Sequence, residues 1–99
     1  MATYVTTLQF TDQGEKKIQK TTKRAAAFKA AAKKMGVKIV GQYWTHGDFD
    51  GLLILEAPDD ETATAVMLHL GSLDNVHTST VRAFVASEME TILKKLPKS

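Results

Sequence analysis

Cysteine is absent from this chain of 99 residues, which excludes disulfide bonds, thiolate catalysis and zinc or iron–sulfur centres held by cysteine. Long apolar runs are also absent, and stretches such as Leu52 to Leu55 are far shorter than the roughly twenty residues that span a bilayer. Thirteen basic and eleven acidic residues leave a net charge of only +2, which is too balanced to indicate nucleic-acid binding by itself. The sequence also lacks a glycine-rich phosphate loop and a Ser-His-Asp order of catalytic residues.

The composition that remains is that of a globular protein. Hydrophobic residues make up 43% of the chain and charged residues 24%, and the length is about enough for one core. We therefore expect residues 1–99 to form a single domain. The first residues lack a basic segment followed by an apolar stretch, so no signal peptide is expected. Together with the missing cysteines, this favours the cytoplasm and gives no reason to expect a membrane partner.

The first half of the sequence predicts a strand followed by a long helix. Residues 3–10 are rich in β-branched and aromatic side chains, which are typical of a strand. Asp12, with Glu15 three places later, predicts the capping box of a helix. The adjacent β-branched Thr21 and Thr22 predict a kink or short break in this helix. Its expected apolar stripe consists of Ile18, Ala25, Phe28, Ala32 and Met35.

Gly36 is expected to end the first helix, because glycine adopts the left-handed conformation without steric penalty. The elements expected after it are a strand over residues 37–46, a turn over 47–51, a strand over 52–57, a helix from 58–60 to Gly71, a strand over 76–86 and a short helix through Leu96. The buried stripe of the second helix is expected to consist of Ala63, Val66, Met67 and Leu70. Ser87 with Glu90 predicts a capping box at the start of the last helix.

The order of these elements is β-α-β-β-α-β followed by a terminal helix. In a chain of this size the order predicts an α+β fold of the ferredoxin-like type, with a four-stranded antiparallel sheet and both long helices on one face. The competing fold, an open parallel sheet, needs strands and helices to alternate, whereas residues 37–57 predict two consecutive strands.

The predicted sheet is apolar on both faces. In the third strand Leu52 and Ile54 point to one face, while Leu53 and Leu55 point to the other. Two helices cover only one face, and the other is expected to expose Trp44 with several aliphatic side chains, which soluble monomers usually avoid. We expect the same sheet of a second copy to cover this face and form a homodimer. The alternative is that the short C-terminal helix folds back over it.

Segments along nearly the whole chain resemble the GYD domain family. These segments are Tyr4-Val5-Thr6, Phe10-Thr11-Asp12-Gln13-Gly14, Lys23-Arg24-Ala25, Tyr43-Trp44-Thr45, Gly47-Asp48-Phe49-Asp50 and Glu56-Ala57-Pro58-Asp59-Asp60. The resemblance implies a small, mostly bacterial protein with a ferredoxin-like fold of the dimeric α+β barrel type, and it implies no particular activity. Phe49 stands where the family's name-giving element has tyrosine, so any role of that hydroxyl is lost here.

The candidate site lies around the turn between the second and third strands. In a ferredoxin-like sheet this turn shares one end of the molecule with the end of the first strand and the start of the fourth. That placement groups Phe10, Thr11, His46, Asp48, Asp50 and His77. His46 is the candidate general base, and Asp50 or Asp48 the group that orients it, because histidine titrates near neutrality. The candidate ligand-binding residues are Tyr43, Trp44, Asp48, Phe49 and His77.

Three functions fit these residues. The first is a homodimer that binds a small, partly apolar molecule near the turn without a cofactor. The second is a cofactor-free monooxygenase in which His46 and Trp44 hold an aromatic substrate, and the third is a structural or regulatory dimerisation module. The turn aspartates can equally bond their own backbone. No metal is expected, because the histidines and acids lack a framework such as His-x-x-x-His.

Basic residues are concentrated in the first predicted helix. It holds eight of the thirteen, namely Lys16, Lys17, Lys20, Lys23, Arg24, Lys29, Lys33 and Lys34. The strand order is also that of RNA-recognition domains, which stack bases on aromatic residues of their central strands. Residues 52–57 contain no aromatic residue, and basic side chains favour a solvated helix face, so no nucleic-acid partner is expected.

Overall fold

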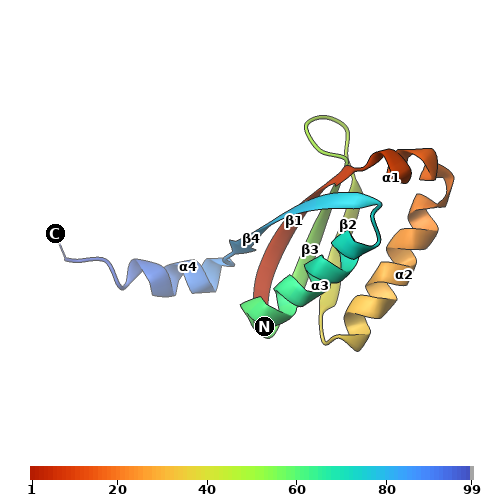
Figure 1. The fold of residues 1–99 in the computed structure, drawn as a ribbon. Helices are drawn as coiled ribbons and strands as arrows, with labels where there is room; N and C mark the ends of the chain where they lie inside the picture. Colours follow the sequence, from red (N-terminus) through yellow and green to blue (C-terminus); the bar gives the residue numbers. More distant parts are fainter. Residues whose placement is uncertain (99) are drawn as a thin grey trace.

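The predicted order of strands and helices is confirmed in a computed structural model, which describes residues 1–98 (Figure 1). The strands are β1 (Ala2–Phe10), β2 (Lys38–Trp44), β3 (Gly51–Ala57) and β4 (Val76–Ala83), and they form an antiparallel sheet in the order β2-β3-β1-β4. The helices are α1 (Asp12–Lys16), the 3-10 helix η1 (Ile18–Lys20), α2 (Thr21–Lys34), α3 (Asp60–Ser72) and α4 (Ala86–Leu93). The fold is therefore ferredoxin-like, as the sequence predicted.

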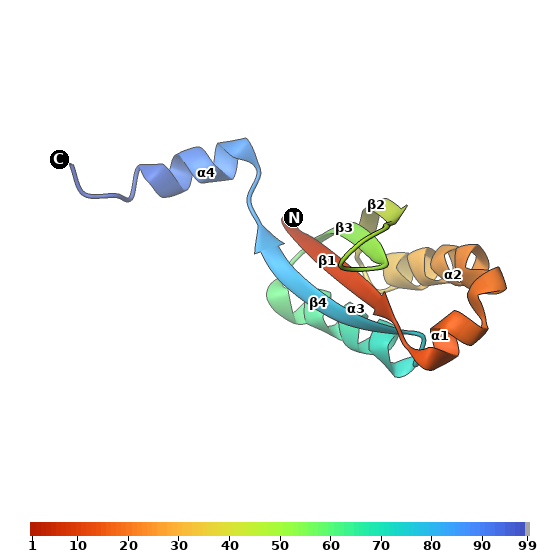
Figure 2. The ribbon, with the colours of Figure 1, turned by 90° about the horizontal axis from the view of Figure 1, so that it is seen from above.

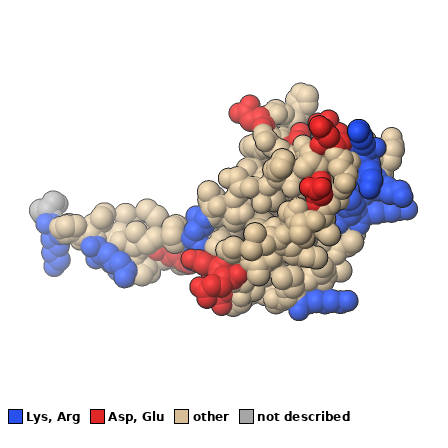
Figure 3. All heavy atoms as spheres, viewed as in Figure 1, with Lys and Arg blue, Asp and Glu red and all other residues tan. Residues whose placement is uncertain are grey.

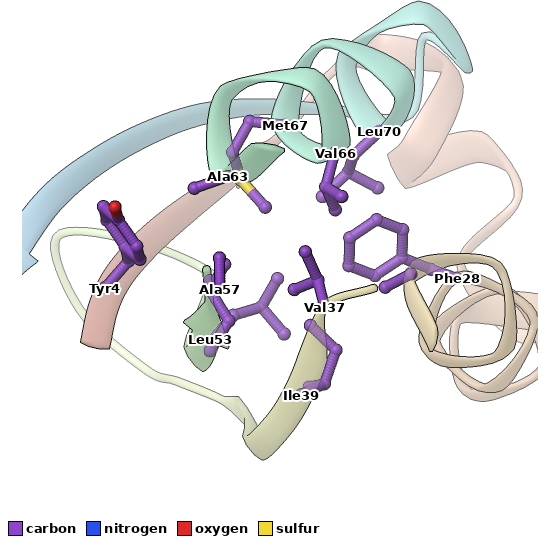
Figure 4. Close-up of a cluster of buried hydrophobic side chains, with 12 residues drawn as sticks. Tyr4, Phe28, Val37, Ile39, Leu53, Ala57, Ala63, Val66, Met67 and Leu70 are labelled. Carbon is purple, nitrogen blue, oxygen red and sulfur yellow. The ribbon is translucent and has the colours of Figure 1, made fainter. Parts of the chain in front are cut away.

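The core lies between one face of the sheet, called here the helix face, and helices α2 and α3 (Figure 4). On the helix face, Tyr4 of β1 pairs with Leu55 of β3, and both side chains are buried. Phe28 from α2 and Val66 from α3 complete the layer. All four residues of the predicted α3 stripe are buried, whereas Ile18 and Met35 of the first stripe are exposed. Burying each large aliphatic side chain contributes about 1.5–3 kcal/mol.

A β-bulge in β2 reverses the expected orientation of its second half. Ile39 pairs with Leu55, but Gly41 rather than Val40 takes the next place, opposite Ile54. The extra residue shifts the alternation by one, since a strand has a side-chain period of two. Trp44 therefore points to the helix face and not, as the sequence predicted, to the uncovered face. Tyr43 points to the uncovered face in its place.

The beginning of the first helix also differs from the prediction. The N-cap is Thr11, whose hydroxyl accepts a hydrogen bond from the Gly14 amide at 3.1 Å, so Asp12 is not the cap. The break falls at residues 17–20, just before the two threonines, because α1 ends at Lys16 and α2 begins at Thr21. Gly36 has the positive φ of 86° expected of a residue that follows a helix end.

Three other boundaries move by a few residues. Helix α3 continues through Gly71 to Ser72, and Asp74, with φ of 70°, makes the turn. Strand β4 ends at Ala83, before the predicted residue 86. Helix α4 begins two residues early, because Glu88 accepts from the Val85 amide at 3.1 Å in place of the Ser87 and Glu90 pairing.

Helix α4 extends away from the sheet as an arm (Figures 1 and 2). The radius of gyration is 15.4 Å, compared with about 13 Å for a compact chain of this length. Arg82 fixes the base of the arm through an ion pair with Glu88 at 3.0 Å and a cation–π contact with Phe84. The pair lowers the pKa of Glu88 chiefly through the Arg82 hydrogen bond, so Glu88 stays ionised into mild acid. Because α4 extends away from the sheet, the alternative in which this helix folds back over its own sheet is wrong.

Candidate functional site

A cleft of about 860 Å³ opens between the helix face of the sheet and the segment from α1 to α2, beside the C-terminal end of α3. Most of its wall is apolar. The main apolar lining residues are Leu8, Phe10, Phe28, Leu53, Leu70, Leu73 and Val76. Clefts of this volume and composition are typical of sites for small molecules.

The break between α1 and α2 lets the two helices pack against different parts of the fold. Helix α1 is held to the loop after α3, because the Thr11 amide donates to the Asn75 carbonyl at 3.1 Å. The Gln13 side chain adds a hydrogen bond to the Asn75 side chain at 2.9 Å. Helix α2 packs instead beside β2, where Gln42 donates to the Ala25 carbonyl at 3.1 Å. The residues at the break, Lys17 and Lys20 among them, line the cleft that lies next to the sheet.

Trp44 lines the cleft at the end of β2. Its indole Nε1 donates a hydrogen bond to the Thr21 hydroxyl at 3.0 Å, so the side chain links the sheet edge to the start of α2. The bulge before Gly41 is what turns Trp44 to this face. Because it is the only tryptophan, its fluorescence can be used to follow binding in the cleft that it lines.

The charged groups of the cleft are mostly cationic. The lining includes Lys16, Lys17, Lys20 and Arg24 but only one carboxylate, Asp50. Arg24 donates to the Lys17 carbonyl at 2.5 Å and to the Gly14 carbonyl at 3.4 Å. The Asp50 carboxylate accepts from the Phe10 amide at 2.8 Å. In Figure 3 the blue side chains of this region gather on the side of the molecule that carries α1 and α2.

The segments that the sequence grouped do meet at one end of the sheet. Asp50 bonds the Phe10 amide, and Gln9 donates to the Asp48 carbonyl at 3.0 Å. The side chains separate, however. Trp44 and Asp50 line the cleft, whereas His46, Asp48, Phe49 and His77 do not. Tyr43 borders the cleft, but it pairs with Leu52 and its side chain lies on the uncovered face.

His46 lies in the loop over residues 45–50, which projects above the sheet in Figure 1, because β2 ends at Trp44. It is exposed, and within residues 1–98 its side chain makes no hydrogen bond. Thr45 donates to the Phe49 carbonyl, so this loop is closed by bonds to its own backbone. His77 pairs with Gln9 across β1 and β4 on the uncovered face, and it also borders a smaller hollow of about 390 Å³ beside α3.

Sequence reasoning missed several residues of the cleft, among them Thr21, Arg24 and His69. Thr21, Ala25 and Phe28 do follow helical spacing, but this pattern is the same whether a helix face packs on a core or lines a cleft. His69, an isolated histidine on α3, is half-buried at the cleft.

Among residues 1–98 no three histidine, aspartate or glutamate side chains gather closely enough to hold a metal ion. The same residues contain no helix with the length and apolar character needed to cross a membrane.

Comparison with known proteins gives two similarities. The GYD domain pattern matches residues 4–93. A Thermus thermophilus protein named "Glutamine synthetase and cystathionine beta-lyase binding protein" is 30% identical over 95 residues, which is 95% of this chain and 100% of that protein.

Proposed function

The chain belongs to the GYD domain family, and on this basis we propose that it is a small binding protein whose cleft holds a small, partly apolar molecule. The observation that carries the proposal is the cleft of about 860 Å³, in which apolar walls are combined with a few polar groups. Of the residues that the sequence singled out, Trp44 and Asp50 support it. Its proposed compartment is the cytoplasm, with which a chain without cysteine is compatible.

The cleft makes a direct prediction for Ala25, a small residue of its wall on α2. Phenylbutanol, a neutral probe with one apolar ring and one polar group, is expected to change Trp44 fluorescence saturably. Ala25→Leu adds three carbon atoms to the cleft wall. Displacing about two methylenes of the probe from the wall, at about 0.8 kcal/mol each, is expected to weaken this binding about tenfold.

Ala26→Leu is the matched control, because Ala26 is exposed on the same helix and does not line the cleft. It should bind phenylbutanol as the unmodified chain does. Equal binding by the two variants, or no binding by the unmodified chain at millimolar probe, would remove the proposed ligand site.

The assembly that we propose is a homodimer formed through the uncovered face of the sheet. The uncovered face, called the open face from here on, carries Val5, Tyr43, Leu52, Ile54 and Val81. Val81 is 59% exposed and Tyr43 57% exposed in the single chain. The open face of a second copy is the favoured cover, because a two-fold axis places the same patch against itself. An exposed apolar face of this kind marks an interaction site in soluble proteins.

The arm supports the same assembly. Its exposed apolar side chains are Phe84, Val85, Met89, Leu93 and Leu96. The Arg82–Glu88 ion pair and the capping bond of Glu88 hold this arm away from its own sheet, so only another molecule can cover it. In a dimer joined through the open faces, the second copy would lie against both the open face and the arm. A single interface would then cover both apolar surfaces.

An enzyme partner is a second candidate function. The relative from Thermus thermophilus is named for binding two enzymes, and its similarity extends over 95% of this chain. Sedimentation of the purified chain with glutamine synthetase from its own source is expected to give a faster-moving complex. Independent sedimentation of the two proteins at micromolar concentration would eliminate this candidate.

The monooxygenase hypothesis receives less support. It requires His46 to face a substrate held by Trp44, and His46 lies in the exposed loop outside the cleft. A proton acceptor must come within hydrogen-bond reach of the group it acts on. The geometry therefore favours binding over catalysis by these residues.

A further inference from the structure

The cleft has a cationic side that the folded chain leaves without acidic partners. Lys16, Lys17, Lys20 and Arg24 line it from α1, η1 and α2. The described residues contain one ion pair, between Arg82 and Glu88, and it lies at the base of the arm. The single carboxylate of the lining, Asp50, accepts from the Phe10 amide. The positive charge beside the apolar wall is thus not neutralised within residues 1–98.

Arg24 is the best placed of these cations. It is half-buried, and its guanidinium is fixed by the carbonyls of Lys17 and Gly14, at 2.5 and 3.4 Å. These two bonds use part of the five N–H donors of a guanidinium, and the remaining donors are free to bind an oxyanion. A guanidinium held in one orientation loses little conformational entropy when it binds a carboxylate, and it binds both oxygens.

The apolar and cationic parts of the cleft belong to one continuous space. Phe10, Phe28 and Leu53 lie along the same lining as Arg24 and Lys20. A molecule that fills this space therefore needs an apolar body and an anionic end. The cationic side chains disfavour a ligand with a positively charged end, because like charges would then meet at Arg24.

We propose that the cleft selects small carboxylates with an apolar body, and that Arg24 anchors the carboxylate. The proposal rests on the ligand-binding function proposed above and adds the charge of the ligand to it. Lys16, Lys17 and Lys20 contribute through their electrostatic attraction at the mouth of the cleft, which salt screens. Arg24 contributes directly, through charge-assisted hydrogen bonds.

Three probes of one shape test this selectivity. Phenylbutyrate, phenylbutanol and phenylbutylamine share the same ring and chain and differ only in the terminal group, and Trp44 fluorescence reports on each. Phenylbutyrate is expected to bind about tenfold more tightly than phenylbutanol, and phenylbutylamine more weakly than both. Raising the salt concentration should reduce the advantage of the anion and the disadvantage of the amine, and leave phenylbutanol binding unchanged.

Arg24→Gln is expected to remove most of the anion's advantage, measured as the ratio of the dissociation constants of phenylbutanol and phenylbutyrate for the same variant. Lys23→Gln is the matched control, because it removes the same charge from an exposed neighbour that does not line the cleft. Circular dichroism of each variant checks that it folds. Equal affinities for the three probes would overturn the anion selectivity but leave the ligand-binding function standing. Failure of all three to bind would overturn both, and equal effects of the two variants would remove Arg24 as the anchor.

Discussion

Ile54→Glu is expected to convert the proposed homodimer into monomers. Ile54 lies on the open face of the central strand β3, between Val5 of β1 and Gly41 of β2. In the proposed dimer, each copy would place an unpaired carboxylate in the middle of an apolar interface. An uncompensated buried charge costs about 3–5 kcal/mol, so the dissociation constant should rise at least about a hundredfold. Analytical ultracentrifugation should show the unmodified chain at twice its mass of 10.9 kDa and the variant at that mass.

Leu68→Glu is the control for this experiment. Leu68 is 69% exposed on α3, which packs on the helix face, so it offers an equally apolar surface away from the proposed interface. This variant should remain dimeric. A monomeric unmodified chain at micromolar concentration, or an Ile54→Glu variant that stays dimeric, would show that the open face is not joined to a second copy. Circular dichroism separates loss of assembly from loss of folding.

Gly14→Ala is expected to be the most damaging small substitution for the cleft wall. A Cβ atom at position 14 would lie 2.1 Å from the carbonyl oxygen of Asn75, and both groups are part of the contact that holds α1 in place. Helix α1 must move, which weakens the Thr11–Asn75 bond and displaces Lys16 and Lys17 from the cleft. Overpacking of this kind costs about 1–3 kcal/mol in the free energy of unfolding, and denaturation by urea would measure it.

Gly71→Ala is the same glycine-to-alanine change, but it is expected to maintain or raise the free energy of unfolding. No atom lies within 4 Å of a Cβ built at Gly71, and the residue lies within α3. Alanine favours a helix over glycine by up to about 1 kcal/mol, so this variant should be as stable as the unmodified chain or more stable. Similar unfolding free energies for the two variants would mean that α1 is not held against Asn75 as the structure places it.

Helix α3 and strand β3 show why the fold could be predicted from the sequence. Ala63, Val66, Met67 and Leu70 recur at helical spacing, and each is buried. Leu53 and Leu55 alternate with Leu52 and Ile54 at a period of two, and the register places the two pairs on opposite faces. Such periodicities depend only on local backbone geometry, which a sequence records directly.

The candidate site was predicted less well because it depends on features without a local signal. The bulge at Ile39 to Gly41 turned Trp44 to the helix face, although no residue type at that point requires a bulge. The strand ended at Trp44, which left His46 in a loop. The threonine pair did indicate the break at residues 17–20, but the position of α1 against Asn75, more than fifty residues away, has no local signal.

The sequence by itself determined the order of strands and helices, their buried stripes and the family to which the chain belongs, since each follows from neighbouring residues and their spacing. The tertiary structure alone decided which way Trp44 points, that the terminal helix stands free as an arm, and that a cationic, apolar cleft forms beside α2. These features arise where distant segments meet, and a one-residue shift in strand register or a short helix break changes them without altering any local pattern.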